Sequence, residues 1–588
     1  MKLVSYFCTA SALALTTVPA FAQEQSTGQT AAGQTAAGQT ATGQAAAGQA
    51  PTTDPTDAQD IIVTANRTES LLSKTPVAIS AITGDGLRAA GITNPTALAD
   101  QVPNISIDRN SGGVQVTIRG VTSTDVSERG DPSAAFLADG VYIARPQAQE
   151  VSFFDVARVE VLRGPQGTLY GRNTTAGLIN VISNRPTFDR FGGSVDVGYG
   201  NYDACQASAA VNLPVSQNLA FRVAGNFDQR DTFTRFGPQV TGRSDPFRKN
   251  LSGRVSGLYK WNSGNLLLRG DYSDIGGHVF DLLPIRNFYA DTPTGIDPIR
   301  LKRSRRAYMT ENANIGWDLY RRNYSWGIGG ELTQDVGPIT VSYVGSYRRF
   351  KRDEEDARIS PDAALAYHYS YDGHYRQQSH ELRLATNGGG PLTLQGGGYF
   401  FKEDSDIVLK GLIGTANPGR TGDGTTLAFF QDPTKAKSYA FFGQGTYALT
   451  DSLRFTAGAR YSHDDKSRVG YTVTCASFFT CARPANAVPN NNASATFAKT
   501  TWRLGLDYDL TPTTLLYGTV STGYKAGGFN DGCERGTGTG CTLTADALYY
   551  DPETLTSYEA GIKTRFLDNA VRLDASAFHY DYNNLQLS

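Results

Sequence analysis

From about residue 191 onward, apolar and polar residues alternate along the chain. In one stretch Phe221 and Val223 share one face, while Asn226 and Asp228 share the other. Two later stretches repeat the pattern, with the apolar sets Phe455, Ala457, Ala459, Tyr461 (opposite Arg454 and Arg460) and Trp502, Leu504, Leu506, Tyr508 (opposite Arg503 and Asp507). Because successive side chains of a strand point to opposite faces, the pattern predicts strands with one apolar and one polar face.

The predicted connections between these strands differ in length. Residues 449–452 and 510–513 read as tight turns, whereas residues 464–499 and 525–549 read as long loops. Short turns at one end and long loops at the other are typical of outer-membrane β-barrels. A secreted β-sandwich or propeller would explain the alternation but not this asymmetry. We therefore predict a mainly β fold, with a transmembrane antiparallel β-barrel over residues 189–588.

The C-terminal end of this region predicts an incomplete barrel. The last strand-like segments are residues 557–566 and 571–582, and the sequence stops at Ser588 without a further strand. A spanning sheet must close, because an open edge leaves unpaired backbone groups in lipid. We expect that the C-terminal strands are missing from this sequence.

The N-terminus predicts export. Lys2 precedes an apolar stretch that ends in Ala20-Phe21-Ala22, a small-x-small cleavage pattern, so residues 1–22 are predicted to be a signal peptide. The stretch is too short to cross a bilayer. Residues 23–59 follow as a Gly/Gln/Thr/Ala repeat without an aromatic residue, which predicts a disordered linker.

Residues 60–188 differ from both neighbouring regions and predict a small α/β domain. Asn94-Pro95 is a favourable start for a short helix, because Asn caps helix N-termini and Pro fits the first turn. Short apolar stretches at residues 136–143, 159–162 and 178–183 predict strands.

Composition narrows the classes of function. The 588 residues carry 54 Lys+Arg and 56 Asp+Glu, a net charge of −2, and no basic tract, which argues against nucleic-acid binding. Mean hydropathy is −0.33, but this average does not exclude a barrel whose strands alternate. Gly164-Pro165-Gln166-Gly167 lacks the end of a phosphate loop, and His380-Glu381 lacks the second His of a metalloprotease. We expect no enzyme, catalytic residue, cofactor or metal site.

Four cysteines form two close pairs in loop-like segments. These pairs are Cys475 with Cys481 and Cys533 with Cys541. Disulfides form readily in exported proteins, so we predict two local disulfides. A metal site is the alternative, although neither pair has C-x₂-C spacing or a nearby His.

Several motifs resemble the TonB-dependent outer-membrane receptors. Residues 60–65 (Asp-Ile-Ile-Val-Thr-Ala) resemble a TonB box, and residues 118–120, 159–165 and 170–171 resemble segments of the plug domain. Residues 523–530 and 553–561 are similar to barrel segments of the same family. The resemblance runs from about Asp60 to the end of the chain.

The resemblance implies a barrel of about 22 strands, filled by a plug of residues 67–188. At roughly 25 residues per strand with its loop, the chain would supply about fifteen or sixteen of these strands. The resemblance also implies a monomer in the outer membrane of a Gram-negative cell, in contact with lipid and with the inner-membrane TonB complex.

The segment 60–66 is the predicted TonB box. β-forming residues after a flexible tether suit addition of a strand to a partner's sheet edge. The predicted TonB-binding residues are Asp60, Ile61, Ile62, Val63, Thr64 and Ala65. An ordinary first strand of the plug is the alternative.

Two further sets of residues are predicted to act inside the barrel. Arg119 and Arg163 need carboxylate partners in the lumen, and the resemblance implies Glu559 from the barrel and Glu160 from the plug. Such pairs would form a latch broken on energisation, or a permanent structural contact. Predicted ligand contacts in an apical loop are Asp125, Glu128, Arg129 and Asp131, with a merely solvated loop as the alternative.

The resemblance implies energy-dependent import of a scarce, bulky small molecule. An iron chelate, namely a ferric siderophore, is the expected ligand, with saccharides or cobalamin as alternatives. A passive porin and a secreted β-rich carbohydrate-active enzyme are the rival classes.

Overall fold

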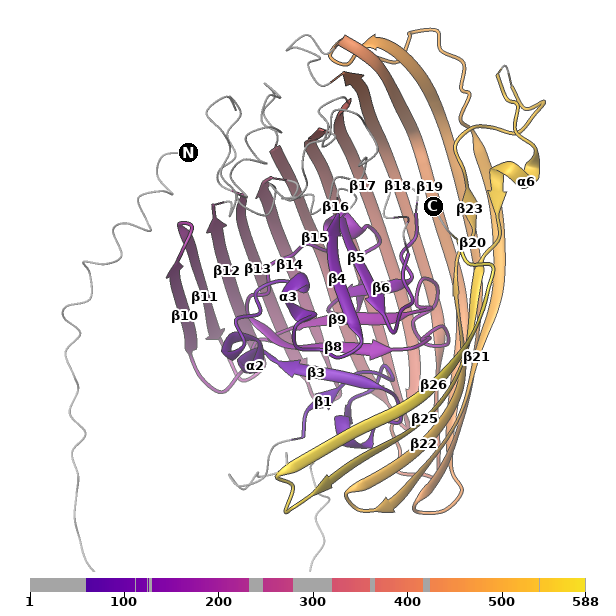
Figure 1. The fold of residues 1–588 in the computed structure, drawn as a ribbon. Helices are drawn as coiled ribbons and strands as arrows, with labels where there is room; N and C mark the ends of the chain where they lie inside the picture. The colour runs from indigo at the N-terminus through magenta and orange to yellow at the C-terminus, as the bar shows by residue number, and fades with distance from the viewer. Residues whose placement is uncertain are drawn as a thin grey trace, which may run out of the picture. The chain divides into compact units, whose positions relative to one another are not determined.

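The computed structural model describes residues 60–110, 113–123, 125, 130–231, 247–278, 320–359, 365–415, 423–538 and 540–586. The predicted signal peptide and linker lie outside these residues. The fold is mainly β, as predicted, and is built from one large sheet and a small N-terminal domain (Figure 1). No helix in the described part of the chain is long and apolar enough to cross a membrane.

The large sheet contains 15 strands, within the range predicted from chain length. Every neighbouring pair is antiparallel, and the order follows the sequence, with β10 and β26 as the end strands. The strands are β10 (Gly192–Gly200), β11 (Ala204–Pro214), β12 (Leu219–Arg230), β13 (Arg248–Trp261), β14 (Gly264–Gly277), β15 (Tyr320–Val336), β16 (Ile339–Ile359), β17 (Leu365–Thr386), β18 (Leu392–Thr415), β19 (Asp423–Ala448), β20 (Leu453–Ser477), β21 (Ala493–Thr511), β22 (Thr514–Lys525), β25 (Glu553–Phe566) and β26 (Val571–Asn583).

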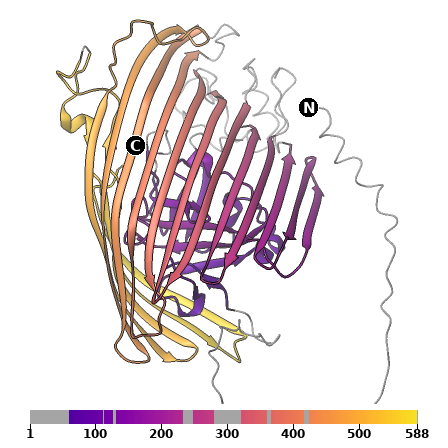
Figure 2. The same ribbon diagram turned by 180° about the vertical axis from the view of Figure 1, so that it is seen from behind.

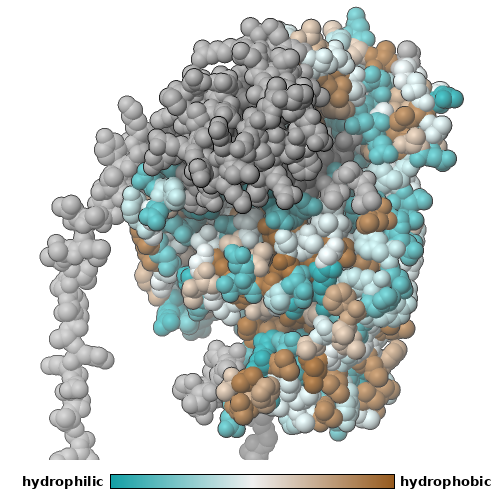
Figure 3. Space-filling view, in the orientation of Figure 1, coloured by the Kyte–Doolittle hydropathy of each residue, from teal (hydrophilic) through white to brown (hydrophobic). Residues whose placement is uncertain are grey.

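The two faces of this sheet carry the predicted chemistry. Leu504 and Leu506 of β21 are exposed on the outer face, whereas Arg503 and Asp507 are buried on the inner face. Figure 3 shows the molecule from the side on which the N-terminal domain lies, and apolar and polar side chains are interspersed over the lower part of the described surface there. The alternation in sequence therefore produces an apolar outside and a polar inside.

Short turns gather at one end of the sheet, as the sequence predicted (Figures 1 and 2). Only two residues separate β21 from β22, whereas 27 residues separate β22 from β25. That long connection contains β23 (Gly528–Phe529), α6 (Ala545–Leu548) and β24 (Tyr549–Tyr550).

The N-terminal domain, residues 60–188, lies against the inner face of the large sheet (Figure 1). Its main sheet has the order β3-β8-β9-β6-β7, in which only the β6–β9 pair is parallel. The strands are β3 (Ile79–Thr83), β6 (Ala134–Ala138), β7 (Val141–Tyr142), β8 (Val156–Arg163) and β9 (Gly177–Ser183). Smaller elements are β1 (Ile62–Val63), β2 (Ser70–Leu71), β4 (Ile105–Asn110), β5 (Gly113–Ile118), η1 (Leu72–Lys74), α2 (Gly84–Ala89), α3 (Pro95–Leu98) and η2 (Pro146–Ala148).

Local sequence explains the short helix and the core of this domain. Asn94 caps α3, because its Oδ1 accepts a hydrogen bond from the Ala97 N–H at 3.1 Å. Buried apolar residues from β8 and β9, among them Val159, Val161 and Ile179, form a core of the domain. Its inner packing holds the domain together, while its surface faces polar residues of the large sheet.

Candidate functional site

Ion pairs connect the N-terminal domain to strands around the large sheet. In each pair, a charged side chain of the domain contacts an oppositely charged side chain on the inner face of a strand. They include Arg67–Glu381 (3.2 Å), Lys74–Asp509 (2.7 Å), Asp131–Lys466 (2.7 Å), Asp139–Arg269 (3.6 Å), Arg145–Glu403 and Asp155–Arg222 (2.5 Å). The partners lie on strands from β12 to β21, so the domain is held from several directions.

Arg119 and Glu559 form one of these pairs, as the resemblance to the family implied. Arg119 Nη1 lies 2.5 Å from Glu559 Oε2, and both side chains are buried. The guanidinium also lies over the ring of Phe578, at 4.1 Å from its centroid, and donates to Tyr580 Oη at 3.1 Å. Tyr517 Oη donates to the other carboxylate oxygen at 2.9 Å. Burial lowers the pKa of Arg119, but the nearby Glu559 carboxylate outweighs burial and leaves this pKa raised.

Arg163 and Glu160 have different partners from those the sequence suggested. The Arg163 guanidinium donates to the Pro103 carbonyl at 3.0 Å. Burial, and then the nearby positive charge of Arg119, lower the pKa of Arg163. Glu160 is fully buried in β8 and forms an ion pair with Arg158 at 2.8 Å.

Glu160 also holds the predicted TonB box. Its Oε1 accepts a hydrogen bond from the Thr64 N–H at 2.8 Å, and its Oε2 accepts one from the Thr64 hydroxyl at 3.0 Å. Tyr170 Oη donates to the Thr64 carbonyl at 2.9 Å. The polar groups of Thr64 are therefore bound within the N-terminal domain.

The rest of the box is also engaged. Ile62 and Val63 form β1, which pairs with β2, and Val63 and Ala65 are buried. Asp60 forms an ion pair with Arg565 of β25 at 2.7 Å. The segment is thus a first strand of the domain in this structure, so binding of a partner strand there would require its release.

The predicted apical ligand contacts are only partly described. Glu128 and Arg129 lie outside the described residues, whereas Asp125 and Asp131 lie within them. Asp131 is 7% exposed, and its carboxylate binds Lys466 at 2.7 Å. Burial raises the pKa of Asp131, but Lys466 and then Arg172 outweigh it, so this pKa lies below its usual range. Its carboxylate joins the domain to β20 rather than facing an open surface.

Sequence reasoning missed the strand residues that bind the domain. Lys466 has the same parity in β20 as Arg454 and Arg460, which the alternation had assigned to the polar face. The alternation along β20 could therefore have predicted that the Lys466 side chain lies on the inner face. Its partner Asp131 is 335 residues away, and no local pattern specifies that pairing.

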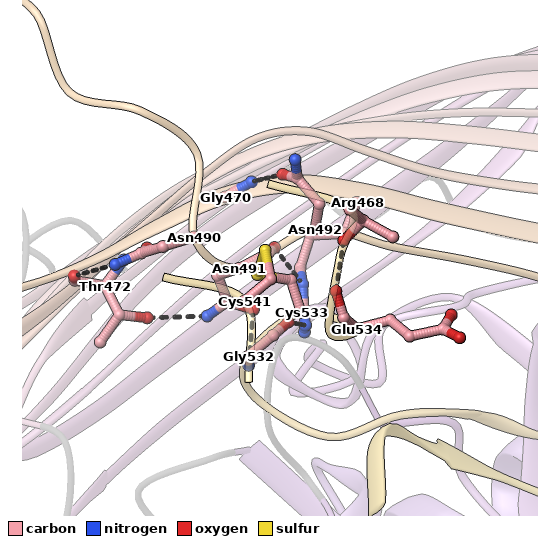
Figure 4. The surroundings of a disulfide bond; sticks show 11 residues. Arg468, Gly470, Thr472, Asn490, Asn491, Asn492, Gly532, Cys533, Glu534 and Cys541 are labelled. Atoms are coloured by element: carbon pink, nitrogen blue, oxygen red, sulfur yellow. Dashed lines mark hydrogen bonds between the residues drawn. A yellow bond between two sulfur atoms is a disulfide. The ribbon is translucent and has the colours of Figure 1, made fainter. Parts of the chain in front are cut away.

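Hydrogen bonds hold the β20–β21 connection and the β22–β25 connection together near a disulfide (Figure 4). The Arg468 guanidinium donates to the Asn491 carbonyl at 2.9 Å and the Asn530 carbonyl at 2.8 Å. Asn491 Oδ1 accepts from the Gly532 N–H at 3.1 Å, and Asn491 Nδ2 donates to Thr472 Oγ1 at 2.8 Å. These bonds join the β20–β21 connection to the β22–β25 connection.

Both predicted cysteine pairs are disulfides in the structure. They are Cys475–Cys481 and Cys533–Cys541. Across the described ranges, no three His, Cys, Asp or Glu side chains are grouped as metal ligands would be.

Comparison with known proteins places this arrangement in a family. The family described as "TonB dependent receptor-like, beta-barrel" matches residues 274–588, and the "TonB-dependent Receptor Plug Domain" matches residues 72–178. The pesticin receptor of Yersinia pestis is 24% identical over 551 residues, which cover 91% of this chain and 72% of that receptor. The vitamin B12 transporter BtuB of Vibrio vulnificus is 28% identical over 188 residues, 31% of this chain and 29% of that transporter.

Solved structures show the same fold. The ferric yersiniabactin uptake receptor FyuA of Yersinia pestis superposes with a TM-score of 0.71 at 19% identity, covering 87% of this chain and 73% of that one. The siderophore receptor PiuA of Acinetobacter baumannii gives a TM-score of 0.65 at 17% identity, with the same coverage.

Proposed function

Because the chain belongs to the TonB-dependent receptor family, we propose that it imports a ferric siderophore across the outer membrane. One solved structure with this fold is described as a siderophore receptor, and another as a ferric yersiniabactin uptake receptor. One observation carries the proposal for this chain: a separate domain is bound by ion pairs to the polar inner face of the large sheet. An obstructed polar interior suits a gated importer better than an open pore.

The proposed organisation follows the family. Residues 1–22 are a cleaved signal peptide, residues 23–59 a linker, residues 60–66 the TonB box, residues 67–188 the plug and residues 189–588 the barrel. The TonB complex energises import by binding the box and pulling on it. The position of Glu160 supports this route, because β8 lies between β3 and β9, so a force on Thr64 reaches an interior strand of the domain's sheet.

The pair of Arg119 and Glu559 serves as a permanent anchor in this proposal. Its guanidinium and carboxylate have further partners in Phe578, Tyr580 and Tyr517. Breaking the pair would leave two buried charges without their principal partners, which costs several kcal/mol. A contact of that cost suits an anchor better than a latch that must open in each cycle.

Cobalamin is the second candidate ligand, because BtuB transporters are among the relatives. The similarity to those transporters spans under a third of either chain, whereas the pesticin receptor aligns along most of this one. Ferric siderophore import is therefore preferred to import of cobalamin or of saccharides.

Growth of a deletion strain tests the proposal. Strains with the intact receptor, with residues 60–65 deleted, and without the receptor would be grown on a panel of ferric chelates, cobalamin and oligosaccharides as limiting nutrients. We expect growth on at least one ferric chelate only with the intact receptor. Growth that survives deletion of residues 60–65 would favour a passive porin, and growth restored only on cobalamin or a saccharide would replace the ligand.

A further inference from the structure

The N-terminal domain fits tightly against one side of the large sheet, formed by β20, β21 and β22. A Cβ added at Gly167 would lie 2.6 Å from the Thr522 carbonyl oxygen, and one added at Gly523 would lie 2.9 Å from Pro165 Cβ. The Asn173 N–H donates to the Tyr524 carbonyl at 2.9 Å, a direct bond between the two backbones. Here glycines are needed because backbone approaches backbone.

The opposite side of the domain, facing β13 to β17, contains cavities instead. One cavity of about 110 Å³ is lined by Val141 of β7 together with Arg254 and Arg348 of the large sheet. A second, of about 290 Å³, reaches Thr64 of the box. The two cavities share the lining residues Asp139, Ser183, Arg269, Glu331 and Val344. They form one seam that runs along the domain to the box.

The large sheet reaches the domain across this seam through its side chains and not through its backbone. Asp139 contacts Arg269 across it at 3.6 Å, and Gln377 Nε2 donates to the Tyr142 carbonyl at 2.7 Å. The nearest part of the domain is β7, an edge strand of two residues that pairs only with β6 in its sheet. Few backbone hydrogen bonds would break if β7 moved away from strands β13 to β17 of the large sheet.

Arginines paired with carboxylates line the seam. Five arginines line the larger cavity, namely Arg67, Arg158, Arg185, Arg269 and Arg383. Each forms an ion pair with a carboxylate, and these partners are Glu381, Glu160, Glu331, Asp139 and again Glu381. The seam is therefore polar, and its charges are paired.

We propose that imported cargo passes along this seam, between β6–β7 and strands β13 to β17, while the tight side facing β20 to β22 stays in place. The cargo is the ferric chelate of the proposed function. The inference rests on the proposed function, because it concerns the route by which that import occurs.

Two covalent tethers test the route. Asp139→Cys with Arg269→Cys places a thiol pair across the seam, and Thr168→Cys with Gly458→Cys places one on the tight side, where a Cβ at position 458 would lie 3.0 Å from Thr168 Cγ2. The four cysteines of the two loop disulfides are already bonded, and Cys205 would be changed to Ser in every variant so that the introduced thiols are the ones that react. Both pairs would be closed with the same short bifunctional thiol reagent, and each single variant treated alike serves as its control.

We expect the seam tether to lower energised uptake of a ferric chelate by about tenfold or more while surface binding persists, and the tight-side tether to lower it by less than about twofold. Equal losses, or a larger loss from the tight-side tether, would overturn the route.

A second measurement does not require a known cargo. Single variants Val141→Cys and Thr168→Cys would be exposed to a periplasmic thiol reagent in cells with an energised or an uncoupled inner membrane. Energisation should increase labelling at position 141 and leave position 168 unchanged. Labelling at 168 alone, or at neither position, would contradict the route. Failure of the intact receptor to carry any ferric chelate would instead contradict the proposed function.

Discussion

Glu160 binds both the backbone N–H and the hydroxyl of Thr64, with distances of 2.8 and 3.0 Å. The two residues are 96 positions apart, yet their contact connects the first strand of the N-terminal domain to β8, an interior strand of its main sheet. The carboxylate is fully buried and is also paired with Arg158. In the proposed function, release of the box must break these bonds.

Glu160→Gln should therefore loosen the box. The amide keeps one acceptor oxygen but loses the charge, so the bonds to Thr64 should weaken by about 1–3 kcal/mol. Hydrogen exchange of the Thr64 amide should accelerate in the absence of ligand. Tyr170→Phe, which removes only the bond to the Thr64 carbonyl, is the matched control and should have a smaller effect. An unchanged exchange rate in Glu160→Gln would contradict the role of this carboxylate.

Glu559→Gln should destabilise the N-terminal domain. It leaves the buried Arg119 without its charged partner, at a cost of about 3–5 kcal/mol. Thermal unfolding measured in detergent should shift to lower temperature, and Arg119→Met combined with Glu559→Gln should recover part of the loss. If the pair is a permanent anchor, the double variant still transports. Loss of transport in a double variant with an unchanged melting temperature would instead indicate a latch that opens on energisation.

Stability at low pH should depend on Asp131. Its pKa in the folded protein is depressed, so its stabilising contribution is complete above the ordinary pKa of about 3.9 and fades as the pH falls toward the lower folded value. The difference in unfolding free energy between the natural chain and Asp131→Asn should be constant above about pH 5 and shrink below about pH 4. A difference that grows on acidification would contradict the ion pair with Lys466.

Removal of the Cys533–Cys541 disulfide should loosen the outer connections. Closure of a loop with a sequence separation of 8 contributes about 2–3 kcal/mol in the chain-entropy description. Limited proteolysis of the β22–β25 connection should become faster when both residues are changed to Ser. The same change at Cys475 and Cys481 should leave that connection protected, because Arg468 and Asn491 still hold it.

The features that the sequence predicted are those that depend on neighbouring residues in the chain. Alternation in β20 and β21 identified inward residues such as Arg460 and Arg503, because a strand has a period of two whatever its partners are. Chain length predicted the number of strands, and the Asn94 cap predicted α3. Each of these features depends on a few neighbouring residues.

Most contacts between the domain and the sheet could not be predicted from the sequence. Arg67 meets Glu381 across 314 positions, and Lys466 meets Asp131 across 335. Such pairs depend on how two folded parts face each other, which no local pattern specifies. The Arg119–Glu559 pair was predicted only through resemblance to a family, and the same reasoning assigned Glu160 to the arginines rather than to Thr64.

Uptake of a radiolabelled ferric siderophore by energised cells decides whether this receptor imports its ligand through TonB. Cells carrying the receptor would be compared with otherwise identical cells that lack TonB, with surface binding measured on chilled cells. We expect equal binding in both strains and accumulation only where TonB is present. Equal accumulation without TonB would contradict TonB-dependent import.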